Sequence, residues 1–175
     1  ASATQGWGRV NLWNAMGRKA NSMLIGPGFL VSGVLADLYR IEGNELVVRP
    51  GIVPNISIPP IQVETVHNVP AYVGNNFGEI DIMTKARLIG ATGSVGQRLM
   101  IFNNATSTFE TVATGPVNGN FFEGVFPVNA GNFANYIVGG TVKIKVQAYL
   151  TGPISSSGWR VGFDQINVRT LRATQ

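Results

Sequence analysis

The segment from Thr141 to Leu150 alternates apolar and polar residues without a break. The apolar set is Val142, Ile144, Val146, Ala148 and Leu150, and the set between them is Lys143, Lys145, Gln147 and Tyr149. A period of two puts each set on its own face, which is typical of a strand with one buried side. Similar alternation recurs from Ile80 to Val168. It predicts an all-β chain, an antiparallel β-sandwich of jelly-roll type.

Turn-forming residues divide this pattern into strands, because Gly and Pro interrupt β-ladders and favour turns. The predicted strands are 29–32, 45–49, 61–66, 79–89, 97–103, 108–112, 121–128, 141–150 and 159–168. The clearest hairpin joins 97–103 to 108–112 through a short run of Asn, Thr and Ser.

The last predicted strand changes phase in its middle. Trp159, Val161 and Phe163 share one face, but the next apolar residues, Ile166 and Val168, have the opposite parity. One extra residue in a strand moves all later side chains across the sheet, so we predict a β-bulge near Asp164-Gln165.

Residues 1–22 have a different pattern and are predicted to form an N-terminal helical arm or linker, with residues 23–175 as the sandwich domain. The apolar residues Trp7, Val10, Leu12, Trp13 and Met16 fit one face of a short helix. That face needs a partner to cover it.

Composition excludes several functions. The 175 residues suit one domain, and the absence of cysteine excludes disulfides, thiolate metal sites and cysteine nucleophiles. Charged residues are 13% of the chain, about half the usual share. The 13 Lys and Arg residues are scattered, so the net charge of +4 does not predict nucleic-acid binding. No apolar run approaches the roughly 20 residues that span a bilayer.

Residues capable of catalysis are sparse, and we predict no enzymatic activity. His67, the single histidine, is interpreted as a loop residue, since no Gly-x-Ser-x-Gly nucleophile motif accompanies it. Glu79 and Asp81 point the same way in a strand and, with Asp164, could hold a structural calcium ion. No other cofactor is expected.

Apolar side chains at strand positions where the pattern otherwise has polar residues favour protein–protein contact. Met83, Met100, Phe102 and Tyr149 occupy strand positions predicted to face outward. Several such residues on one sheet face mark an interaction surface. Together with Trp7, Leu12, Trp13 and Met16 of the arm, they predict self-association or docking on another surface protein.

Aromatic residues near strand ends leave a second interpretation open. Tyr72 and Trp159 could form a platform for polysaccharide, as aromatic rings do in many sandwich modules.

Most of the chain, from about Ser22 to Val168, resembles a β-sandwich domain that recurs, usually C-terminally, in secreted and surface proteins of bacteria. The resemblance lies in the stretches 30–37, 46–52, 97–103, 109–112, 142–146, 151–153 and 159–165. It implies a secreted or cell-surface, non-catalytic module, and it transfers no active-site residues.

A shorter resemblance concerns Gly6-Trp-Gly-Arg-Val-Asn11, followed by Ala15. This run is similar to the closing segment of subtilisin-like protease domains. It implies an accessory domain of a secreted protease, with every catalytic residue upstream of this chain.

Overall fold

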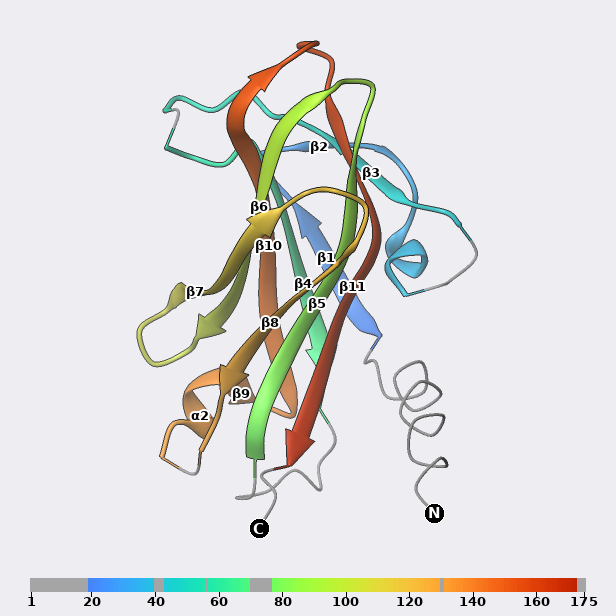
Figure 1. Ribbon diagram of the computed structural model, residues 1–175. Coiled ribbons are helices and arrows are strands. Elements are labelled where there is room, and N and C mark those ends of the chain that lie inside the picture. The colour runs from blue at the N-terminus through green and yellow to red at the C-terminus, as the bar shows by residue number, and fades with distance from the viewer. Residues whose placement is uncertain (1–18, 40–42, 56, 70–76, 130, 173–175) are drawn as a thin grey trace, which may run out of the picture.

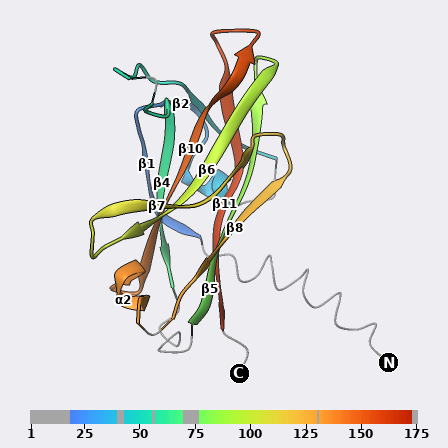
Figure 2. The same ribbon diagram turned by 60° about the vertical axis from the view of Figure 1, so that its left-hand side comes forward.

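The computed structural model describes residues 19–39, 43–55, 57–69, 77–129 and 131–172, which form two antiparallel sheets packed face to face (Figures 1 and 2). The six-stranded sheet has the order β1 (Ala20–Ile25), β4 (Ile61–Asn68), β10 (Thr141–Ile154), β6 (Gly93–Asn103) and β7 (Thr108–Pro116), with β9 (Ile137–Val138) also on β10. The five-stranded sheet has the order β2 (Phe29–Ser32), β3 (Leu46–Arg49), β11 (Arg160–Arg172), β5 (Phe77–Ile89) and β8 (Phe121–Pro127). Two single-turn helices, η1 (Leu35–Leu38) and α2 (Phe133–Tyr136), lie in the connections. The predicted all-β, jelly-roll-like sandwich is confirmed.

The core lies between the inner faces of the two sheets. The six-stranded sheet contributes Ile61, Val63, Leu99, Ile101, Val142, Ile144, Val146 and Ala148, all fully buried. The five-stranded sheet contributes Leu46, Val48, Ile80, Ile82, Val161, Phe163, Ile166 and Val168, also fully buried. Burying one Val, Leu, Ile or Phe side chain stabilises a fold by about 1.5–3 kcal/mol, so this seam is the main source of stability.

The predicted bulge in the last strand is confirmed. Phe163 pairs with Ala86 and Gln165 pairs with Lys85, which leaves Asp164 as the extra residue. The bulge keeps Val161 and Ile166 on the same inner face despite their opposite parity. The Asp164 carboxylate forms an ion pair, since Lys85 Nζ lies 2.6 Å from Asp164 Oδ2.

A buried hydrogen bond joins the two sheets. Thr84 Oγ1 on β5 donates to Gln97 Oε1 on β6 over 2.7 Å, and both residues are fully buried. Gln97 Nε2 in turn donates to the carbonyl oxygen of Pro116 at 2.8 Å. These bonds satisfy polar groups that would otherwise oppose burial.

Three details of the sequence prediction need correction. His67 is not in a loop: it ends the inward row of β4, is fully buried, and its Nε2 lies 2.8 Å from Thr65 Oγ1. Leu150 is 45% exposed, because the buried row of β10 ends at Ala148. Ala20–Ile25 form β1, so the predicted boundary after residue 22 falls inside a strand.

Residues 1–18, which carry the rest of the predicted arm, lie outside the described residues. Within the described part of the chain, no helix is long and apolar enough to cross a membrane.

The outer face of the five-stranded sheet holds a buried ion pair. Arg169 Nε donates to Asp81 Oδ2 over 2.7 Å, and the Asp81 side chain is fully buried while Arg169 is 17% exposed. Glu123 Oε1 lies 3.5 Å from Arg169 Nη2. The arginine therefore compensates a carboxylate that has no contact with water.

Arg169→Met is expected to lower the free energy of unfolding by about 3–5 kcal/mol, because it leaves the Asp81 charge buried without its partner. Urea denaturation measures the effect. Arg87→Met is the matched control: the Arg87 side chain is 58% exposed in its pair with Glu45, so its loss is expected to cost about 1 kcal/mol or less. Equal losses in the two variants would contradict the role of the buried pair.

Glu123→Gln is expected to change the pH dependence of stability. Burial raises the pKa of Glu123 above 4.5, and the Asp81 charge raises it further, although Arg169 lowers it. The folded state thus binds this proton more tightly, and that contribution is lost as the pH rises through the folded pKa. The glutamine variant should therefore melt at a higher temperature than the parent at pH 7. The difference should close below about pH 4.5. A variant that is less stable than the parent at pH 7 would show that the attraction to Arg169 dominates.

Candidate functional site

The outer face of the six-stranded sheet is the candidate site. The buried rows of β4, β6 and β10 direct the alternate side chains away from the core. These side chains form cross-strand rows, in which Tyr149 is opposite Gly96, Gln147 is opposite Arg98, and Lys145 is opposite Met100. On the other side of β6, β7 places Pro116 opposite Gly96 and Thr114 opposite Arg98.

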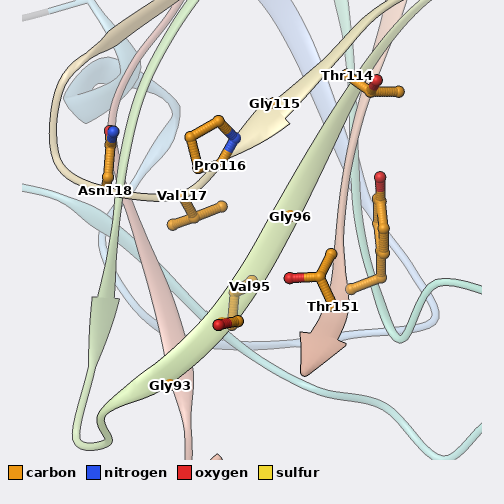
Figure 3. A pocket seen from close by; sticks show the side chains of 11 residues that line it. Gly93, Val95, Gly96, Thr114, Gly115, Pro116, Val117, Asn118 and Thr151 are labelled. Carbon is orange, nitrogen blue, oxygen red and sulfur yellow. The ribbon is translucent and has the colours of Figure 1, made fainter. Parts of the chain in front are cut away.

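A hollow of about 510 Å³ lies at one end of this face, around Gly96. Figure 3 shows Pro116 on one side of β6 and Thr151 on the other, and Thr114 comes from β7, as Pro116 does. The polar side chains that line the hollow are Ser94, Thr114, Asn118, Tyr149 and Thr151. They are hydroxyls and one amide, each able to donate and to accept hydrogen bonds. Charged side chains are absent from the described lining.

Gly96 makes this hollow possible. A Cβ at this position would lie 2.7 Å from Thr151 Cγ2 and 3.2 Å from Cε2 and Cζ of the Tyr149 ring. The missing side chain lets the ring lean over the strand, close to the backbone. Glycine inside a strand often marks such an approach.

A chain of polar groups leads from the hollow across the sheet. The Arg98 guanidinium carbon lies 5.4 Å from the centre of the Tyr149 ring. Arg98 Nη1 donates to Gln147 Oε1 at 3.4 Å, and Gln147 Nε2 donates to Gln62 Oε1 at 3.2 Å. These contacts hold Arg98 beside the hollow.

Two lysines and two phenylalanines continue the face beyond Arg98. Lys143 Nζ lies 4.5 Å from the centre of the Phe102 ring, and Lys145 Nζ lies 3.9 Å from the centre of the Phe109 ring. The two rings meet edge to face at 5.0 Å. Lys145 also pairs with Glu64 on β4 at 2.9 Å.

The structure separates residues that the sequence grouped together. Met100, Phe102 and Tyr149 do share the outer face of the six-stranded sheet, and all three are half-buried. Met83 does not join them: it lies on β5, opposite Glu123 and Asn167, on the outer face of the other sheet. The parity of a residue predicts that it points outward but not from which sheet.

Trp159 is not available as a ligand platform. It is 5% exposed and belongs to the core cluster, since it precedes the inward row of β11. Tyr72, the other predicted platform residue, and the arm residues Trp7, Leu12, Trp13 and Met16 lie outside the described residues. Their roles stay predictions.

Two of the three carboxylates considered for calcium have partners within the chain. Asp81 pairs with Arg169 and Asp164 pairs with Lys85. Among the described residues, no group of three or more His, Asp or Glu side chains is placed to hold a metal ion. Structural calcium stays a prediction.

Comparison with known proteins gives likeness in fold. No family model matches the chain, and no curated protein matches it. Among solved structures, a family 4 carbohydrate-binding module is 12% identical, with a TM-score of 0.46 over 85% of this chain and 86% of that one. A Clostridium thermocellum xylanase 10B fragment with a family 22 module, complexed with xylohexaose, is 14% identical, with a TM-score of 0.47 over 91% of this chain and 29% of that one. The family 32 module of AlyQ, in complex with 4,5-unsaturated mannuronic acid, is 9% identical, with a TM-score of 0.46 over 90% and 99%.

These comparisons report β-sandwich modules, and the architecture of this chain is itself a β-sandwich. They do not show the link to subtilisin-like proteases, whose matching residues 6–15 are outside the described part of the chain.

Proposed function

We propose that this chain is a non-catalytic module of a secreted or cell-surface protein, and that it binds polysaccharide on the outer face of its six-stranded sheet. The observation that carries the proposal is the hollow around Gly96. It combines one aromatic ring with uncharged hydroxyl and amide side chains. Its volume of about 510 Å³ lies within the range of small-molecule sites, roughly 300–1,000 Å³.

The chemistry of the lining suits sugar hydroxyls. A sugar hydroxyl both donates and accepts, and so do Ser94, Thr114 and Thr151 around the hollow. The Tyr149 ring adds an apolar surface with a polar tip, a combination that favours amphipathic ligands. The hollow lies on a sheet face that continues past Arg98, so a polymer can extend beyond one subsite.

Tyr149→Ala is expected to weaken binding to the preferred polysaccharide roughly tenfold, or about 1.4 kcal/mol, because it removes the aromatic wall. Retention on a panel of insoluble polysaccharides finds the ligand, and calorimetry with soluble oligosaccharides measures the affinity. Phe121→Ala is the matched control, since Phe121 is a 58% exposed aromatic residue on the five-stranded sheet. Absence of binding across the panel, or a loss in Phe121→Ala alone, would refute the proposal.

Self-association is a second candidate, favoured by an exposed apolar edge. The edge consists of Leu24 on β1 and of Phe29, Leu30, Val31 and Val34 in and after β2, which are 43–65% exposed. β2 lies at the end of its sheet and pairs with β3 on one side. An apolar edge strand is a template for pairing with another chain. Residues 26–36 contain no charge, and the nearest cation described at this edge is Arg49, over the Phe29 ring at 4.9 Å.

Leu30→Lys is expected to shift any dimer toward monomer, because it places two like charges across a symmetric edge contact. Size-exclusion chromatography with light scattering, over a range of concentrations, measures this shift. Val125→Lys, on β8 at the opposite end of the same sheet and 51% exposed, is the control. A parent protein that is monomeric throughout would refute this candidate. Removal of residues 1–18 in the same assay tests the predicted role of the arm.

A further inference from the structure

We infer that the preferred ligand is an acidic polysaccharide, a polymer that carries carboxylate groups such as a polyuronate. This inference rests on the proposed function, because it concerns the chain that would extend from the Gly96 hollow. The observation that carries it is a line of cations beside the hollow, on β6 and β10.

The cations lie in successive rows of the sheet. Arg98 occupies the row next to Gly96, Lys145 occupies the row after it, and Lys143 lies two residues further along β10. Residues two apart on a strand are separated by roughly 6–7 Å. A ligand that follows the strands from the hollow therefore passes one cationic side chain in each row, of which Lys145 is paired with Glu64.

Few carboxylates oppose these charges. The described strands of the six-stranded sheet contain two, Glu64 and Glu110. Glu64 pairs with Lys145, and Glu110 accepts hydrogen bonds from Asn103 and Tyr136. No described carboxylate forms an ion pair with Arg98 or Lys143. The face thus keeps two uncompensated positive charges.

Aromatic rings hold the cations in place without neutralising them. Lys143 lies over Phe102, Lys145 over Phe109, and Arg98 over Tyr149. A cation over a ring gains about 0.5–1 kcal/mol at an exposed site and keeps its charge. Long side chains that are already ordered lose less entropy when a ligand binds.

The same contacts disfavour a nucleic acid as the ligand. Proteins that bind single strands stack bases on open aromatic faces. Here the lysine ammonium groups lie over Phe102 and Phe109, and the two rings pack edge to face on each other. Charge alone would remain to attract a phosphate backbone.

The experiment compares polygalacturonate with the same polymer after reduction of its carboxyl groups, by affinity electrophoresis and calorimetry at 50 and 300 mM NaCl. The parent protein is expected to bind the acidic polymer at least tenfold more tightly at low salt. The double variant Arg98→Gln/Lys143→Gln should lose most of that preference, so that its affinity for the acidic polymer falls to about its affinity for the reduced polymer. Arg160→Gln, at the start of β11 in the other sheet, is the matched control and should behave as the parent.

The other outcomes separate the two proposals. Equal binding of both polymers, with no effect of the double variant, would overturn the acidic ligand and leave polysaccharide binding intact. Failure to bind either polymer or any member of the polysaccharide panel would overturn both. Binding of poly(dT) as tightly as polygalacturonate, with the same salt dependence, would replace the acidic glycan with a general polyanion.

Discussion

Apolar burial between the two sheets determines which side chains of each strand point inward and which point outward. Val142, Ile144 and Val146 must face Ile80, Ile82 and their neighbours to leave water. Because the period of a strand is two, their polar neighbours have to point outward. The rows that carry Arg98, Lys145 and Tyr149 are therefore a consequence of the core, and the core supports them from beneath.

The parts of the fold that depend on local pattern could be predicted from the sequence. The alternation in 141–150 and the phase change at Asp164 both identify strands and faces, since each is a property of a few adjacent residues. What depends on pairing between distant strands could not be predicted. Met83 and Met100 have the same kind of context along the chain, but they lie on opposite outer faces.

The candidate site was predictable only in part. The sequence predicts Tyr149 as an outward-facing residue of a protein–protein surface, because it ends a polar row, and the glycine at 96 is a further signal of a close approach. Thr114, Pro116 and Thr151 form the hollow only through the register of β7 and β10 on β6. Trp159 is an aromatic residue near a turn in the sequence, yet the start of β11 lies over the core and buries its ring.

The two outer faces hold their charges in different surroundings. The five-stranded sheet carries Glu79, Asp81, Glu123 and Asp164 on its strands. There Arg169 and Lys85 form ion pairs with carboxylates of the same sheet, so their charges are compensated within the protein. On the six-stranded sheet, Arg98 and Lys143 lie over aromatic rings and have no ion-pair partner among the described carboxylates, so they can still attract an external charge.

The bond between Thr84 and Gln97 has a consequence for how this surface meets a ligand. Gln97 stands between Gly96 and Arg98 in the chain, and its amide is tied both to the opposite sheet and to the end of β7. The backbone beneath the hollow is thereby braced from the interior on two sides. On the proposed function, the polymer would change its conformation on binding, while the backbone of this sheet would keep its shape.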